Sequence, residues 1–159
     1  GVMHVARCFL PAMIEHGGHI VNIASASGLL PLPKMCVYAS SKWAVIGWSE
    51  SLRVELEGMG QPVRVLTVNP SYINTGMFEG AKAPLLTPIT QPDWVVSRII
   101  RAVQRDMAVL NLPFLVNLVP LMRGVLSARL FDIIGGRWFR IYNSMDDFKG
   151  HGGAGQPST

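Results

Sequence analysis

The chain contains an apolar run bounded by glycines, GHIVNIASASG (residues 18–28), and soon after it YASSK (residues 38–42). Residues 20–24 carry no charge and are apolar apart from Asn22, which is typical of a strand buried on both faces of a parallel sheet. Ser25 follows this strand, so we expect its hydroxyl at the carboxyl end, where open α/β sheets bind ligands. The run therefore predicts an α/β fold with a site at that edge.

Tyr38 and Lys42 stand four residues apart, one helical turn, and so share a helix face. An ammonium close to a phenol favours the phenolate and lowers the pKa of the phenol towards the range of a general acid or base. The same spacing also occurs in many helices where the tyrosine packs and the lysine is solvated. Ser25, thirteen residues before Tyr38, favours proton transfer to or from an alcohol or carbonyl oxygen.

A third motif, NPSYINT (residues 69–75), follows a predicted strand at 63–68. In order and spacing the three motifs resemble the short-chain dehydrogenase/reductase family, with specific similarity from residue 1 to about residue 106. The resemblance implies an α/β fold with a doubly wound, Rossmann-like parallel sheet. No glycine-rich strand–turn–helix precedes the motifs, so we expect residues 1–149 to be the carboxyl-terminal portion of one catalytic domain and residues 150–159 to be a disordered tail.

The resemblance also implies roles for individual residues. Tyr38 would be the general acid/base, Lys42 would support it and hold the nicotinamide ribose, and Ser25 would hold the reacting oxygen. The cofactor would be NAD or NADP, with NAD favoured. Tyr38 and Lys42 would contact it together with Pro70, Ile73 and Thr75.

The third motif departs from the family pattern at one position. Ser71 stands where the family has glycine, and serine resists a positive φ. This substitution puts the geometry of the turn in doubt more than the cofactor site itself.

Residues 74–80 and the apolar carboxyl-terminal region resemble the branch of retinol and hydroxysteroid dehydrogenases. The implied reaction is interconversion of a lipophilic primary or secondary alcohol and its carbonyl compound, a step of lipid metabolism. Without the segment that binds adenosine and pyrophosphate, we expect the isolated chain to be inactive. Six side chains would line an apolar pocket or, alternatively, cover the end of the sheet: Met77, Phe78, Leu85, Leu86, Phe114 and Leu115.

Apolar spacing predicts helices at residues 2–15, 37–57 and 93–106, and a short edge strand at 108–112. In the second helix the apolar stripe is formed by Trp43, Ile46, Leu52 and Leu56. In the family the first two helices form the subunit interface, which implies a homodimer or homotetramer. The alternative from another class is a non-catalytic dimerising or lipid-binding module derived from the same fold.

Composition restricts the remaining classes. Of 159 residues, 49% are hydrophobic and 15% charged, against about 25% charged in typical soluble domains. The net charge of +4 is scattered, which argues against a nucleic-acid partner. Two cysteines and four histidines show no metal-ligand spacing, so we expect no metal.

Residues 107–122 are uncharged but fall short of the roughly twenty residues that span a bilayer, and prolines interrupt them. We therefore expect a cytoplasmic protein in which this segment closes the substrate end. The alternative is an apolar lip, within residues 107–131, that rests on a membrane.

Overall fold

The computed structural model describes residues 1–75, 88–138 and 142 of the chain. Helices and strands alternate as α1 (Val2–His16), β1 (Gly18–Ile23), α2 (Cys36–Gly58), β2 (Val63–Pro70), α3 (Pro92–Gln104) and β3 (Val109–Leu112). A 3-10 turn, η1 (Ala26–Gly28), separates β1 from α2. After β3 come the short elements η2 (Phe114–Asn117), α4 (Leu118–Val125), α5 (Ala128–Asp132) and the π-helical η3 (Ile133–Trp138).

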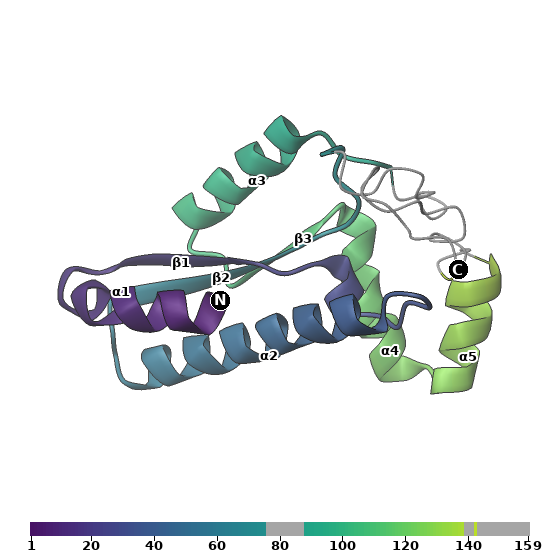
Figure 1. The fold of residues 1–159 in the computed structure, drawn as a ribbon, viewed down its shortest axis with the longest axis horizontal. Coiled ribbons are helices and arrows are strands. Elements are labelled where there is room, and N and C mark those ends of the chain that lie inside the picture. Colours follow the sequence, from purple (N-terminus) through teal and green to yellow (C-terminus); the bar gives the residue numbers. More distant parts are fainter. Residues whose placement is uncertain (76–87, 139–141, 143–159) are drawn as a thin grey trace, which may run out of the picture.

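The three strands form one parallel sheet in the order β1-β2-β3. Gly18 pairs with Val63 at one end of β1, and Thr67 pairs with Val109 where β3 begins. Helices α1 and α2 cover one face of the sheet and α3 covers the other (Figure 1). The expected doubly wound parallel sheet is confirmed, in a chain that holds part of such a fold.

Glycines set the two tight connections that lead into the sheet. Gly17 ends α1 at φ 78°, with its amide bonded to the Met13 carbonyl at 2.7 Å, and Gly18 follows at φ 143°. Gly60, at φ 66°, follows the end of α2. Backbone conformations with positive φ strain residues that carry a Cβ but not glycine. The glycines therefore explain why the helices end where the sequence predicted.

Strand β2 lies at the centre of the core because both of its faces are covered. Val63 and Val65 pack against Leu56 and partly buried residues of α1 and α2. Leu66 and Val68, with 0% of their surface exposed, pack against the α3 side. This pattern explains the continuous apolar composition of the strand.

One buried polar contact also fastens α2 to the sheet. The Asn22 side chain in β1 donates from Nδ2 to Ser49 Oγ at 2.9 Å, and Ser49 donates to the Val45 carbonyl at 2.6 Å. Both side chains are buried. Asn22 therefore holds a helix in place and does not face the open edge of the sheet.

The described surface carries exposed apolar residues but no spanning segment. Within the described residues, β1 has one strand neighbour, and Ile23 at its end is 46% exposed. None of the described helices is long and apolar enough to cross a bilayer. Among the same residues, no three histidine, cysteine or acidic side chains lie close enough to hold a metal ion.

Leu66→Ala should lower the free energy of unfolding by about 3 kcal/mol, because it removes buried methyl groups and leaves a cavity between well-packed layers. Chemical denaturation followed by circular dichroism measures this. The matched control Val54→Ala, on an exposed part of α2, should change stability by less than about 0.5 kcal/mol. Equal effects of the two substitutions would contradict a core centred on β2.

Candidate active site

Ser25 lies two residues beyond β1, at the start of η1. Its backbone is extended (φ −173°, ψ 156°), and its Oγ accepts a hydrogen bond from the Ser27 amide at 3.2 Å. The same hydroxyl donates to the Pro70 carbonyl at the end of β2, over a long 3.5 Å. A hydrogen bond of this length is weak and can be exchanged for one to a bound oxygen. Ser25 is thus held between the carboxyl ends of two strands.

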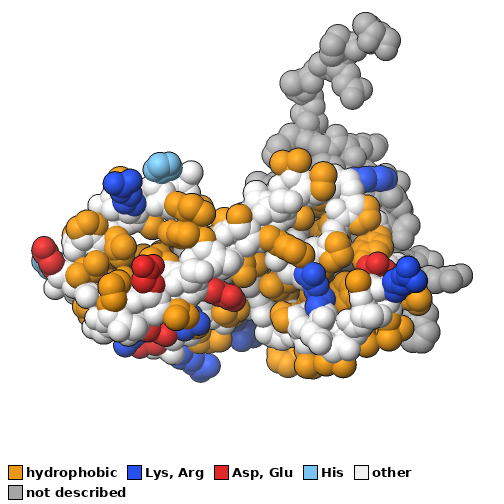
Figure 2. All heavy atoms as spheres, turned by 90° about the horizontal axis from the view of Figure 1, so that it is seen from below, with side chains coloured by type: hydrophobic (Ala, Val, Ile, Leu, Met, Phe, Trp, Pro, Cys, Tyr) orange, Lys and Arg blue, Asp and Glu red, His pale blue; other side chains and the backbone are white. Residues whose placement is uncertain are grey.

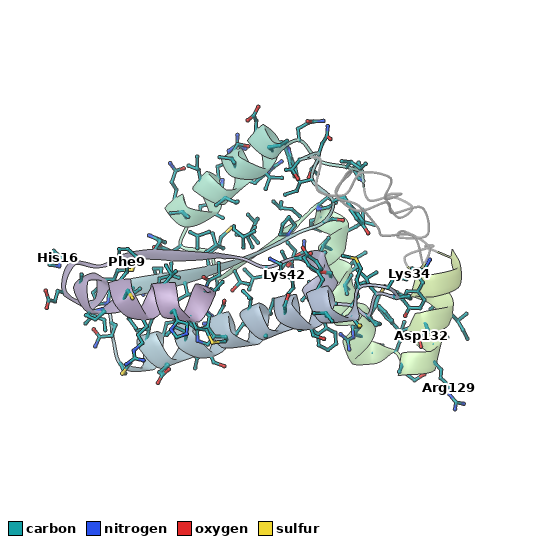
Figure 3. All side chains as sticks on the ribbon, in the orientation of Figure 1. Phe9, His16, Lys34, Lys42, Arg129 and Asp132 are labelled. Atoms are coloured by element: carbon teal, nitrogen blue, oxygen red, sulfur yellow. The ribbon has the colours of Figure 1, made fainter. Side chains whose placement is uncertain are left out.

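Tyr38 and Lys42 lie in the first turns of α2, as the spacing predicted. Lys42 Nζ is 5.7 Å from the centroid of the Tyr38 ring and donates to the Ile23 carbonyl at 3.1 Å. Figure 3 shows Lys42 between α2 and the sheet, near the end of β1. Burial lowers the pKa of the Lys42 ammonium. A partly desolvated cation acts more strongly on its neighbours than a solvated one.

Gly28 allows η1 to lie directly against α2. A Cβ at this position would lie 2.6 Å from Ile46 Cδ1, 2.9 Å from the Lys42 carbonyl carbon and 3.0 Å from its oxygen. The turn that carries Ser25 can therefore approach the helix segment that carries Lys42 only if residue 28 has no side chain. In the sequence, this contact is marked only by a glycine within a loop.

The turn after β2 holds the three residues expected to contact the cofactor. Pro70 ends the strand, and the Ser71 amide donates to the Leu112 carbonyl of β3 at 2.7 Å. Ile73 forms an isolated parallel bridge with Thr90. The Thr75 amide donates to the Ile73 carbonyl at 2.8 Å. The turn is thus bonded to β3 on one side and to the segment before α3 on the other.

Ser71 does not adopt a strained conformation in this turn. Outside glycine, positive φ angles in the described part of the chain occur at Lys34 and Asp106. The turn therefore accommodates a Cβ at position 71, and the doubt raised by the serine does not apply to its backbone.

Three asparagines extend from the end of β2 into the apolar carboxyl-terminal segment. Asn69, 1% exposed, donates to Asn111 Oδ1 at 2.8 Å, and these two residues are register partners. Asn111 donates to Asn117 Oδ1 at 3.0 Å, and Asn117 donates to the Phe114 carbonyl at 2.8 Å. Asn69 Oδ1 is buried and has no hydrogen-bond partner among the described residues. The sequence did not indicate the Asn69–Asn111 and Asn111–Asn117 contacts, because each joins residues on different elements.

The expected apolar pocket can be located only in part. Met77, Phe78, Leu85 and Leu86 lie outside the described residues. Of the two described members, both in η2, Phe114 is 79% exposed and Leu115 is partly buried. The pocket therefore stays a prediction.

The structure places all six predicted site residues at or next to the carboxyl edge of a doubly wound parallel sheet: Ser25, Tyr38, Lys42, Pro70, Ile73 and Thr75. The fold is that of the doubly wound α/β class, in which ligands bind at this edge of the sheet. The family model described as "short chain dehydrogenase" matches residues 1–85, and the chain belongs to the short-chain dehydrogenase/reductase family of NAD(P)-binding oxidoreductases.

Within that family the chain is similar to the retinol and hydroxysteroid dehydrogenase branch. Epidermal retinol dehydrogenase 2 of Mus musculus is 37% identical over 155 residues, which cover 91% of this chain and 48% of the relative. Retinol dehydrogenase 10-B of Danio rerio is 36% identical, over 80% of this chain and 39% of the relative. Estradiol 17-beta-dehydrogenase 11 of Rattus norvegicus is 31% identical, over 80% of this chain and 43% of the relative. The chain spans less than half the length of each of these relatives.

Solved structures support the fold. A short chain dehydrogenase from Burkholderia cenocepacia in complex with NADP superimposes with a TM-score of 0.69 at 24% identity, covering 81% of this chain and 52% of that one. A short chain dehydrogenase/reductase from Burkholderia phymatum in complex with NAD gives 0.63 at 23% identity, covering 77% and 53%. At these identities the likeness establishes the fold alone.

Gly28→Ala should destabilise the protein by about 1–3 kcal/mol, because the new methyl group forces η1 away from Ile46 and Lys42. Thermal unfolding measures this as a lower Tm. The matched control is Gly47→Ala in α2, where a Cβ meets nothing within 4 Å, so its Tm should be unchanged or higher. A Tm for Gly28→Ala at or above that of the parent would show that η1 does not need this close approach.

Proposed function

We propose that this chain is the carboxyl-terminal portion, over residues 1–149, of an NAD(P)-dependent oxidoreductase that interconverts a lipophilic alcohol and its carbonyl compound. The observation that carries the proposal is the position of Lys42. Its Nζ lies 5.7 Å from the Tyr38 ring centroid and bonds to the Ile23 carbonyl, two residues before Ser25. A phenol, an ammonium and a hydroxyl at one sheet edge suit proton transfer to an oxygen.

The described residues fit the nicotinamide end of a dinucleotide. The Lys42 ammonium has three N–H donors and makes one hydrogen bond among the described residues, so two donors are available to ribose hydroxyls. The turn with Pro70, Ile73 and Thr75 lies at the same edge and would meet the carboxamide. NAD or NADP would supply or accept the hydride when bound, and we favour NAD.

In carbonyl reduction, Tyr38 would donate its hydroxyl proton to the substrate oxygen as the carbon receives the hydride. In oxidation, the phenolate would take the alcohol proton. Ser25 would exchange its long bond to Pro70 for a hydrogen bond to the substrate oxygen and so hold it. Lys42 would stabilise the phenolate by its charge.

The lipophilic substrate is supported by similarity and by exposed apolar residues. Relatives at 31–37% identity are a retinol dehydrogenase and an estradiol dehydrogenase by name. On η2 and α4, exposed apolar residues recur every three or four positions, at Phe114, Leu118, Leu121 and Val125. Such a stripe would either border the substrate entrance or rest on a membrane surface, so we propose a cytoplasmic enzyme with peripheral membrane contact.

We further propose a homodimer or homotetramer in the whole enzyme. On α1, Val5 and Phe9 are exposed, and on α2 so is Val54. Exposed apolar patches on helices support contact with a second copy. The same exposed helices favour the second candidate function, a dimerising or lipid-binding module without catalysis, which predicts no turnover from the whole protein.

Tyr38→Phe in the whole enzyme should lower turnover by about 10²–10⁴-fold, because it removes the proton-transfer group and keeps the ring. Cofactor affinity should stay within about twofold. The measurement is oxidation of retinol and of a steroid alcohol, each with NAD and NADP. The control is Tyr142→Phe: that hydroxyl bonds to Asp132, and its loss should leave turnover unchanged. Full activity of Tyr38→Phe would sink the proposed role.

Lys42→Met should weaken cofactor binding and move the onset of oxidation to higher pH. Removing a positive charge disfavours the phenolate, so the base form appears only as the pH rises further. Because burial lowers the pKa of Lys42, the parent also loses this charge towards alkaline pH, and the two profiles should converge there.

Lys42→Arg keeps the charge and is the matched control: its profile should keep the onset of the parent even if its rate falls. If the pH–rate profile of Lys42→Met has the same shape as that of the parent at a lower rate, the lysine only positions the cofactor and does not support the phenolate. If Lys42→Met leaves both the rate and the pH–rate profile unchanged, Lys42 is a solvated surface residue without a role in the reaction.

A further inference from the structure

A cleft of about 470 Å³ opens beside α2, between η1 and α4. Ser25, Tyr38 and Lys42 are not among its lining residues, while Gly28 of the turn that follows Ser25 is. Its volume lies within the range of small-molecule sites. Its walls include Leu29, Trp43, Ile46, Gly47, Pro120 and Arg123.

Arg123 is the charged residue of the cleft lining, and two contacts fix its guanidinium. The group lies 4.6 Å from the Trp43 ring, and Nη1 donates to the Leu29 carbonyl at 2.9 Å. Among the described residues it makes no other hydrogen bond or ion pair. The Asp132 carboxylate accepts a hydrogen bond from the Tyr142 hydroxyl. Within the described part of the chain, the guanidinium therefore keeps N–H donors available for an anion.

The rest of the cleft suits a hydrocarbon chain. Trp43 belongs to the apolar stripe predicted for its helix, and in the structure it is 41% exposed and forms a wall of the cleft. Cβ atoms at Gly47 and Gly124 would meet nothing within 4 Å, so both glycines leave open space. Seen from below, hydrophobic side chains with a few cationic ones gather over the end of the molecule that carries α4 and α5 (Figure 2).

We propose that this cleft binds a fatty carboxylate, with the alkyl chain against Trp43 and Ile46 and the carboxylate on Arg123. The planar fork of arginine matches the two oxygens of a carboxylate, and a single cation offsets its single charge. An apolar wall with one fixed cation is complementary to an amphiphile with one anionic end. The site goes beyond the proposed oxidoreductase function and does not depend on it.

The test compares ligands of equal chain length below their micellar concentrations. Calorimetric titration of the full chain should show that laurate binds at least about tenfold more tightly than dodecanol, because the charged head adds hydrogen bonds to Arg123. Trp43 fluorescence should change on binding, and Trp43→Phe should remove that change. Equal affinity for laurate and dodecanol would overturn the proposal, and tighter binding of dodecyl phosphate would overturn the carboxylate assignment.

Arg123→Gln should weaken laurate binding by about tenfold or more and leave dodecanol binding unchanged. The matched control is Arg98→Gln, because Arg98 also lies over a tryptophan, Trp94, at 5.1 Å but on α3. This control should bind laurate as the parent does. Parental laurate affinity in Arg123→Gln, or an equal loss in both variants, would overturn the proposal.

Gly47→Leu tests the cleft without removing a charge. The leucine should fill the space and abolish laurate binding, while the Tm stays at or above that of the parent, since a Cβ there meets no atom within 4 Å. Gly58→Leu at the end of the same helix has equally open surroundings and should bind normally. Laurate binding retained in a folded Gly47→Leu would overturn the proposal. A second outcome would also overturn it: the parent binds no laurate, and Gly47→Leu forms a smaller oligomer than the parent. A second copy of the chain would then cover the cleft.

Discussion

The hydrogen bond from Lys42 Nζ to the Ile23 carbonyl joins the helix that carries Tyr38 to the strand that leads to Ser25. Because the donor is charged and partly buried, this bond is stronger than a neutral surface contact and fixes the first turns of α2 over the strand end. The absence of a side chain at Gly28 brings the intervening turn into the same contact. The local geometry of the site therefore depends on one cation and one glycine.

This arrangement is supported by a strand that is buried on both faces. Leu66 and Val68 face α3, while Val63 and Val65 face the other two long helices. Packing on both faces of β2 thus holds the end of the strand that carries Pro70. The site lies where the sheet ends, but its position is determined several residues earlier in the core.

The sequence predicted those features that depend on residues close together along the chain. Apolar runs predicted the strands, and glycines predicted where the helices end. A four-residue spacing placed Tyr38 and Lys42 one turn apart on α2. The position of Ser25 followed from the strand before it.

Contacts between distant elements were not predictable in the same way. Asn69 and Asn111 are 42 residues apart, and nothing in either local segment indicates that they pair. Arg123 lies 94 residues from the carbonyl that it holds, and nothing in the sequence around Trp43 indicates that its ring lies against this guanidinium. The concern over Ser71 came from a family pattern, and the observed backbone does not require a glycine there.

The asparagine chain has a direction, and that direction has a consequence. The Phe114 carbonyl can only accept, so Asn117 must present its NH₂ group to it, and this choice fixes the orientation of Asn111 and then Asn69. The orientation of an amide at the end of β2 is thus set by one peptide group in η2, two residues beyond β3. Rotation of that peptide would invert all three side chains together and replace a buried acceptor beside the turn after β2 with a donor.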